Sequence, residues 1–250
     1  MEDFREMKKE FDRDGYVVMR DFMGAEEAAA ISNQIDGFIA AVLPTRSEPL
    51  AFYEVNDRPE TIMRLQNMQD YDEFFGQLLH EDRFVSMASQ LLGDDVVARN
   101  LQWFNKPARV GSVTPPHQDG FYFMLEPNEA VTLWLALDLV DEENGCVRYV
   151  SGSNREGMRP HQRSNVIGFS QGITDYGDSD RERETPILAA PGDLFAHHCM
   201  TIHRADANTS ERPRAALGFV YDAARAVYDS QAAAAYQKQL YQQWENEGRL

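Results

Sequence analysis

The stretch Pro115–Gly120, with the sequence PPHQDG, places an imidazole and a carboxylate two residues apart. On an extended backbone, residues i and i+2 point to the same face, so His117 and Asp119 can offer a nitrogen and an oxygen to one ion. The two prolines stiffen the approach to the pair, and Gly120 frees the exit. A His-x-Asp pair alone is a weak indication of a metal site, so its meaning depends on a third ligand elsewhere in the chain.

Histidines gather a second time near residue 200. The run 195–203 contains three of the six histidines of the chain: His197, His198 and His203. Two histidines and one carboxylate form a facial triad, which leaves coordination positions open and suits non-haem Fe(II) oxygen chemistry. The same ligands can hold zinc, which favours a closed site or one with a single water.

Segments rich in strand-forming residues follow one another from Val96 onward. They are residues 97–105, 131–137, 146–150, 186–188, 193–196 and 215–221. Short strands at this spacing, separated by glycine, proline and polar turns, predict an antiparallel sandwich or barrel. The turn Glu143–Gly145 predicts that residues 146–150 return as a hairpin partner of residues 131–137.

Helical periodicity dominates the chain before this point. We expect helices over residues 2–14, 26–42, 71–79 and 82–92, a short strand at 16–19, an irregular segment at 44–60 and a closing helix at 230–247. No linker rich in proline, glycine or serine is evident. We therefore expect one α+β domain over residues 1–250, with a helical part to about 95 and a jelly-roll core over about 96–222.

The composition excludes several functional classes. The 250 residues include 41 acidic and 24 basic side chains, and the net charge of -17 argues against binding to nucleic acid or to anionic membranes. Two cysteines define no disulfide framework, and neither a signal segment nor a membrane span is evident. We expect a cytoplasmic protein that acts on a small molecule. The sequence does not indicate an oligomeric state.

Several short motifs, taken together, resemble the phytanoyl-CoA dioxygenase family. They are His117-Gln118-Asp119, Glu143–Cys146, Ser151–Ser153 and the series His203, Asn208, Ser210 and Arg214. The resemblance covers about residues 96–222 and extends more loosely over the helical part. It implies a double-stranded β-helix and an oxygenase that uses Fe(II), 2-oxoglutarate and O2. Such enzymes hydroxylate an unactivated C–H bond and release succinate and CO2.

The resemblance also selects among the histidines. In that family an arginine eleven positions after the distal histidine binds the far carboxylate of 2-oxoglutarate. His203 and Arg214 have this spacing, whereas no arginine lies eleven residues after His197 or His198. A planar, permanently charged guanidinium suits this role better than an ammonium group. The resemblance therefore implies the metal ligands His117, Asp119 and His203.

Four further residues are implied as cosubstrate contacts, each with an ordinary alternative. Trp134 stands where relatives carry an aromatic residue, Thr132 shares its strand face, Gln102 lies on the preceding strand, and Arg64 matches a basic residue facing the site. Trp134 could equally be core, Thr132 and Gln102 structural, and Arg64 a solvated helix residue. Relatives often have a serine two positions after the distal histidine. This chain has Ala205, so that polar contact is missing or another group supplies it.

The type of activity and the substrate stay open. A family member that binds metal and cosubstrate without turnover, or a zinc-dependent hydrolase, fits the same ligands. A carboxylate at 119 favours hydroxylation, because related halogenases have a small residue there. The family name implies an acyl-CoA substrate, but the chain is acidic and has only one local basic cluster: Arg155, Arg159, His161 and Arg163. The long polar segment 153–184 predicts a mobile cover over the site.

Overall fold

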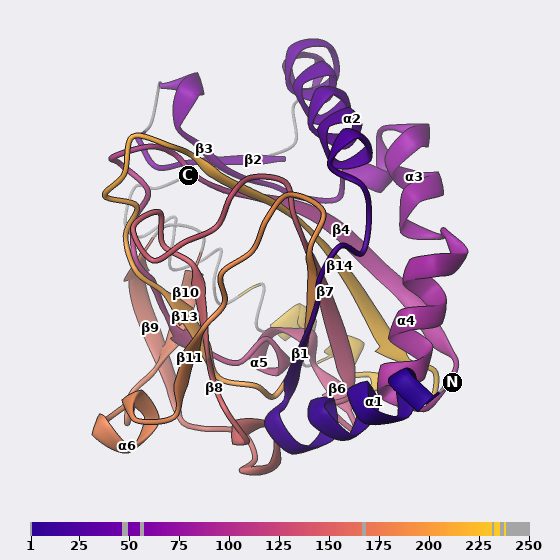
Figure 1. Cartoon of the computed structure of the whole chain (residues 1–250). Coiled ribbons are helices and arrows are strands. Elements are labelled where there is room, and N and C mark those ends of the chain that lie inside the picture. The colour runs from indigo at the N-terminus through magenta and orange to yellow at the C-terminus, as the bar shows by residue number, and fades with distance from the viewer. Residues whose placement is uncertain are drawn as a thin grey trace.

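Two antiparallel sheets form the centre of the computed structural model, which describes residues 2–46, 50–55, 58–166, 169–231, 233–235 and 238 (Figure 1). The larger sheet has the strand order β1-β12-β7-β14-β4-β3-β2, and the smaller has the order β11-β8-β13-β5. The strands of the larger sheet are β1 Tyr16–Met19, β2 Ala51–Tyr53, β3 Ile62–Leu65, β4 Val96–Lys106, β7 Ala130–Ala136, β12 Leu194–His198 and β14 Arg214–Ala223. Those of the smaller sheet are β5 Thr114–His117, β8 Val147–Val150, β11 Glu184–Pro186 and β13 His203–Ala205. This is the double-stranded β-helix, or jelly roll, that the sequence predicts.

The first four helices lie where the apolar periodicity predicts them, whereas the short helices α5 and α6 were not predicted. Their bounds are α1 Glu2–Asp14, α2 Ala25–Gly37, α3 Glu73–Leu79, α4 Asp82–Leu92, α5 Gly120–Phe123 and α6 Asp178–Arg181. The first turn of α3 is capped by Asp72, whose carboxylate accepts a hydrogen bond from the Phe74 amide at 2.9 Å. Gly93 ends α4 in the left-handed conformation with φ 66°. Among the described helices, none has the length and apolar character needed to cross a membrane.

Two helix predictions differ in detail from the structure. The helix predicted over 26–42 continues beyond α2 as a π-helical turn, Phe38–Val42, and then a 3-10 turn, Leu43–Thr45. Of the closing helix predicted over 230–247, residues 230–231 and 233–235 are helical, with the Ala233 amide bonded to the Asp229 carbonyl at 3.0 Å. Residues 239–247 lie outside the described part of the chain.

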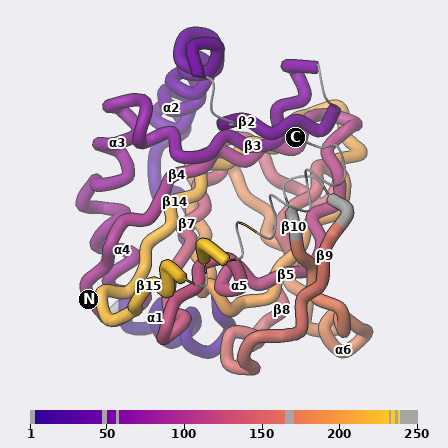
Figure 2. The backbone as a smooth tube through the Cα atoms, turned by 180° about the vertical axis from the view of Figure 1, so that it is seen from behind, coloured from indigo at the N-terminus to yellow at the C-terminus, as the bar shows by residue number. Residues whose placement is uncertain are grey.

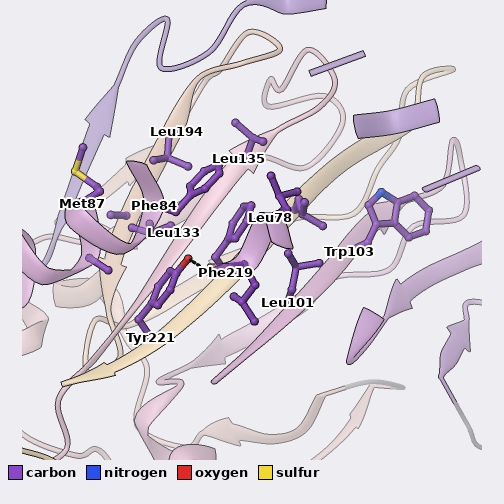
Figure 3. Close-up of a cluster of buried hydrophobic side chains, with 14 of the residues drawn as sticks. Leu78, Phe84, Met87, Leu101, Trp103, Leu133, Leu135, Leu194, Phe219 and Tyr221 are labelled. Carbon is purple, nitrogen blue, oxygen red and sulfur yellow. Dashed lines mark hydrogen bonds between the residues drawn. The ribbon is translucent and has the colours of Figure 1, made fainter. Parts of the chain in front are cut away.

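Strand β7 of the larger sheet is buried on both faces. The outer face of the sheet carries Leu133, Leu135, Phe219 and Tyr221, which pack against the N-terminal helices (Figures 1 and 3). The ring of Phe84 on α4 stacks on Phe219 at a centroid distance of 4.1 Å, a contact that adds to the area buried there. The alternate residues of β7 point the other way, towards the smaller sheet. The helices therefore cover one face of the sheet and leave the opposite face for the interior between the sheets.

The hairpin predicted between residues 131–137 and 146–150 is wrong. Strand β7 pairs with β12 and β14, whereas β8 pairs with β11 and β13 in the other sheet. The turn at 143–145 instead carries the chain from one sheet to the other. Asn144 stabilises it by donating from Nδ2 to the Leu139 carbonyl at 2.7 Å. The turn at 143–145 was predicted correctly, but a turn does not determine which sheet the following strand joins. Strand β7 has β12 and β14 on its two edges.

Two segments contain more structure than their composition predicts. The irregular segment 44–60 contributes β2, which pairs with β3, so Arg64 lies on a strand and its reading as a helix residue is wrong. The polar segment 153–184 contains α6 and the hairpin of β9 His161–Val166 and β10 Phe169–Ile173 (Figure 2). Two more short strands, β6 Leu125–Glu126 and β15 Val227–Tyr228, pair with each other. Mobility of the 153–184 segment stays a prediction.

Gly145 provides a test of the crossing between the sheets. Its φ is 79°, and a Cβ atom there would lie 2.4 Å from the Asp206 carbonyl oxygen. We expect Gly145→Ala to lower the free energy of unfolding by at least about 1–3 kcal/mol. The control is Gly37→Ala, at an exposed helical position with nothing within 4 Å of the new atom. Gly37→Ala should raise the free energy of unfolding by about 0.5–1 kcal/mol. Urea unfolding of both variants measures this, and equal stability of the two would contradict the account.

Candidate metal centre

Three potential metal ligands meet at the mouth of the smaller sheet. His117 ends β5, Asp119 follows two residues later, and His203 begins β13 directly opposite His117 in the strand register. The Nε2 atoms of His117 and His203 lie 3.6 Å and 3.7 Å from the Asp119 Oδ1 atom. One ligand atom from each residue lies within 4.8 Å of the others. A single ion can therefore contact all three.

Backbone carbonyls orient both histidines of this group. The Nδ1 atom of His117 lies 2.8 Å from the Pro115 carbonyl oxygen, and that of His203 lies 3.0 Å from the Thr201 carbonyl oxygen. A carbonyl oxygen can only accept, so each Nδ1 carries the hydrogen and each Nε2 keeps its lone pair. Burial lowers the pKa of both imidazoles, which keeps them neutral at pH 7.

Asp119 supplies the negative charge of the group. Burial alone would raise the pKa of this carboxyl, but His203, His197 and His117 more than offset it and hold the pKa well below its usual range. The ionised carboxylate and two neutral imidazoles form a donor set with one net negative charge. Such a set suits a divalent cation.

The neighbouring histidines of β12 separate onto opposite faces. His197 points into the interior, where its Nε2 lies 3.0 Å from the Asp119 Oδ2 atom. His198 points away from it, accepts a hydrogen bond from the Met200 amide at 3.1 Å and lies 6.1 Å from the Phe11 ring. Adjacent strand residues alternate in this way. The structure therefore brings His197 to the site and keeps His198 out of it.

Arg214 lines a pocket whose walls come from β3, β4, β5 and β14 and include none of the three ligands. The pocket is formed by Glu54, Met63, Arg64, Phe104, Asn105, Lys106, Ser112, Val113, Thr114 and Arg214. The Arg214 side chain is 5% exposed, and its guanidinium lies 5.0 Å from the Trp134 ring centroid. Its Nε atom has no hydrogen-bond partner among the described residues. Burial lowers the pKa of Arg214 to about 10, so it is charged at neutral pH.

Lys106 is a second buried cation in this pocket, and the sequence interpretation missed it. It lies directly opposite Arg214 in the register of β4 and β14 and is 4% exposed. Its Nζ donates to the Ser112 carbonyl. Burial and the charge of Arg214 lower its pKa to about 7. The sequence did contain a signal for placing Lys106 at the site. Lys106 stands four residues after Gln102 on the same strand, so the two side chains share one face.

The structure also places the remaining predicted contacts. Thr132 donates a hydrogen bond to the Asp119 Oδ2 atom at 3.1 Å, so its hydroxyl is on the metal side of the interior. Trp134 is a core residue that stacks on Phe195 at 4.4 Å, and the Arg214 guanidinium lies over its ring. Its contact with the cosubstrate stays a prediction. Gln102 is buried and donates to the Asn100 Oδ1 atom at 3.0 Å.

Arg64 lines the same pocket from β3. Its guanidinium lies 5.6 Å from the Phe52 ring and 5.7 Å from the Phe104 ring, both as centroid distances. Burial lowers its pKa, and the charge of Asp119 partly opposes that effect. The pocket thus carries three basic side chains from three adjacent strands and one carboxylate, Glu54.

The basic cluster near residue 160 is engaged within the protein. Arg159 pairs with Asp175 at 2.9 Å and with Asp180 at 3.3 Å. The His161 Nε2 atom accepts a hydrogen bond from the Gln118 amide at 3.2 Å, and its ring stacks on Phe121 at 4.5 Å. The β9–β10 hairpin therefore docks beside the Pro115–Gly120 stretch.

Comparison with known proteins places these features in a family. A family model described as phytanoyl-CoA dioxygenase (PhyH) matches residues 11–216. The mouse peroxisomal phytanoyl-CoA dioxygenase is 24% identical over 226 residues, which cover 85% of this chain and 66% of that protein. A probable alpha-ketoglutarate-dependent hypophosphite dioxygenase of Stutzerimonas stutzeri is 24% identical over 229 residues, covering 89% of this chain and 80% of that protein.

Solved structures share the fold. The epimerase SnoN, in complex with Fe3+, alpha ketoglutarate and nogalamycin RO, has a TM-score of 0.74 at 23% identity and covers 91% of this chain and 86% of its own. EvdO2 from Micromonospora carbonacea var. aurantiaca, complexed with 2-oxoglutarate, has a TM-score of 0.71 at 23% identity and covers 90% and 92%. Since the family model extends over most of the chain, the protein belongs to the phytanoyl-CoA dioxygenase family.

Proposed function

We propose that the protein is an Fe(II)- and 2-oxoglutarate-dependent dioxygenase that hydroxylates a small molecule. The observation that carries the proposal is the convergence of two imidazole nitrogens and one carboxylate oxygen within 4.8 Å of one another. A separate pocket with a buried arginine supports it. His117, Asp119 and His203 hold the metal, and Arg214 holds the far carboxylate of 2-oxoglutarate. Family membership supports both assignments.

The donor set fits iron. Two neutral imidazoles and one carboxylate on adjacent chain segments match the facial triad of non-haem Fe(II) oxygenases and leave positions for other ligands. When bound, the iron supplies O2 activation coupled to conversion of 2-oxoglutarate to succinate and CO2. The chain's own part is to hold the ligands in a fixed orientation and to keep the site buried.

The pocket fits a dicarboxylate. Among the described residues, no carboxylate forms a close ion pair with Arg214, and Asp138 compensates its charge only in part, which leaves a costly buried charge. An incoming carboxylate would supply the missing charge and accept hydrogen bonds from the guanidinium. Lys106 is positioned to provide the polar contact that Ala205 cannot, because it faces the same pocket.

The domain organisation, location and partners of the protein are also proposed. Strands β1 and β2 of the N-terminal part belong to the larger sheet, which supports a single domain over residues 1–250. The free cysteines Cys146 and Cys199 support a cytoplasmic location. The acidic composition supports a small-molecule substrate without nucleic acid or membrane partners.

Succinate release tests the proposed reaction. Protein loaded without oxygen with Fe(II) and 2-oxoglutarate is mixed with oxygenated buffer and a panel of small metabolites, and succinate and hydroxylated product are quantified by mass spectrometry. One panel member should stimulate succinate release and gain one oxygen atom. Binding of 2-oxoglutarate without succinate under every condition would favour the non-catalytic alternative. Hydrolytic activity with zinc alone would favour the hydrolase.

The choice of distal ligand predicts a contrast between two histidines. His203→Ala removes one of three donors and should greatly weaken Fe(II) binding and abolish succinate release. His198→Ala, on β12 of the larger sheet, removes a side chain that faces away from the site and should leave both unchanged. Anaerobic metal titration measures the difference. Normal metal affinity in His203→Ala together with its loss in His198→Ala would reverse the assignment.

Arg214 predicts a loss of cosubstrate affinity on a conservative change. Arg214→Lys keeps a positive charge but loses the planar fork. The apparent affinity for 2-oxoglutarate should fall about tenfold or more, equivalent to about 1.4 kcal/mol. Titration of the metal-loaded protein with 2-oxoglutarate without oxygen measures this, and an unchanged curve would contradict the role of Arg214.

Lys106 predicts that cosubstrate binding depends on pH. Its pKa of about 7 means that the ammonium is charged below pH 7 and largely neutral above it. An anion raises this pKa, so binding above pH 7 takes up a proton and the affinity should fall as the pH rises from 7 to 9. Lys106→Met should bind more weakly and lose this dependence. A flat wild-type profile over this range, at saturating metal, would be inconsistent with the prediction.

A further inference from the structure

The two oxygens of the Asp119 carboxylate have different surroundings. Oδ1 faces the Nε2 atoms of His117 and His203, at 3.6 Å and 3.7 Å. Oδ2 faces the larger sheet, where Thr132 donates to it at 3.1 Å and His197 Nε2 lies at 3.0 Å. One oxygen is thus directed to the ion position, and the other is held by hydrogen bonds.

His197 is itself held by a buried phenol. The Tyr149 hydroxyl lies 2.8 Å from the His197 Nδ1 atom, and Tyr149 is 0% exposed. A phenol has an ordinary pKa of about 10 and therefore carries its proton at neutral pH. The phenol can therefore donate to Nδ1.

The carboxylate contact sets the hydrogen positions of His197. An ionised carboxylate oxygen can only accept, so His197 Nε2 carries a hydrogen and donates to the Asp119 Oδ2 atom at 3.0 Å. In the neutral ring, Nδ1 then accepts from the Tyr149 hydroxyl. The opposite tautomer would place the lone pair of Nε2 against an ionised oxygen at 3.0 Å in a buried site. The chain of donation therefore runs from Tyr149 to His197 and from His197 to Asp119.

Both sheets contribute to this arrangement. Tyr149 lies on β8 directly opposite His203, and its ring stacks on Tyr16 at 4.9 Å with an interplanar angle of 18°. His197 lies on β12 directly opposite Thr132. The rings are therefore fixed by strand register and by packing, and the hydrogen bonds join the two sheets across the interior.

We propose that His197 and Tyr149 are positioning residues that hold Asp119 as a one-oxygen metal ligand. Two donors on Oδ2 keep this oxygen from turning towards the ion, so that Asp119 occupies one coordination position and leaves others for the cosubstrate. Partners of this kind orient ligands and tune metal sites. The inference rests on the proposed role of Asp119 as a ligand.

Cobalt binding tests the inference without turnover. Metal-free protein is titrated with Co(II) without oxygen, and both the affinity and the visible absorption spectrum of the bound ion are recorded. His197→Phe keeps a ring but removes the donor, and it should weaken Co(II) binding about tenfold or more and change the spectrum. His197→Gln keeps an N–H donor and should restore part of the affinity.

Tyr149 should act only through His197. Tyr149→Phe should weaken Co(II) binding by less than His197→Phe does. Adding Tyr149→Phe to His197→Phe should cause no further loss, since the relay is already broken. The matched control is Tyr16→Phe, because this ring stacks on Tyr149 and the same atom is removed. It should bind Co(II) as the wild type does.

The outcomes separate this inference from the proposed function. Failure of the wild type to bind Co(II) would contradict the metal site itself. Normal wild-type binding, with unchanged affinity and spectrum in His197→Phe, would show that His197 is only a core residue and overturn the inference. If His197→Phe does not fold, the same two measurements on Tyr149→Phe decide the question. A Tyr149→Phe variant with the affinity and spectrum of the wild type overturns the inference. Weaker Co(II) binding with a changed spectrum supports it.

Discussion

Burial of both faces of β7 is the constraint on which the rest of the structure depends. All seven residues of this strand are buried, so each has a defined environment on one side of the larger sheet. Leu133 and Leu135 pack towards the helices, while Thr132 and Trp134 point to the interior. A slip of one residue would exchange these two sets, and the apolar contacts with the helices would be lost. The hydrophobic core therefore fixes the register of the polar residues at the site.

The distribution of charge follows from the same layering. The chain as a whole is strongly acidic, yet Arg64, Lys106 and Arg214 are gathered on the inner face of the larger sheet. Their charges are desolvated, so each gains more from an anion than an exposed base would. The acidic exterior disfavours large polyanions, whereas the interior favours a small one. This contrast agrees with the proposed pocket for a dicarboxylate.

Periodicity predicted most of the elements, because helices with one apolar face and half-buried strands have readable patterns. It failed for β2 and β3, which are short, and for β9 and β10, whose polar residues show no alternation. The partner of β7 was wrong because pairing between distant strands leaves no local trace. The two-residue spacing of His117 and Asp119 was only a weak indication. Its extended geometry is also not observed, because β5 ends at His117 and Asp119 has helical dihedral angles, φ -58° and ψ -34°. The selection of His203 and Arg214 required family resemblance, since no spacing rule connects residues in different sheets.

The neighbours of the candidate ligands were harder to predict than the ligands. A buried tyrosine such as Tyr149 has the pattern of a core residue, and Lys106 at a strand end has that of a surface residue. The choice between His197 and His198 depends on which face of β12 each occupies. Which of the two residues faces the interior is known only when β12 is placed in the sheet.

The pairing of β1 with β12 has a consequence for how the protein is made. These strands join residues 16–19 to residues 194–198, so the edge of the larger sheet cannot close until residue 198 has been synthesised. At about 5–20 residues per second, β1 waits roughly 10–35 s for its partner to be translated. His203 follows β12 in the chain, so the three candidate ligands first meet only after both strands have been translated. The nascent protein is therefore unable to capture its metal until the core that surrounds the site is ready to form.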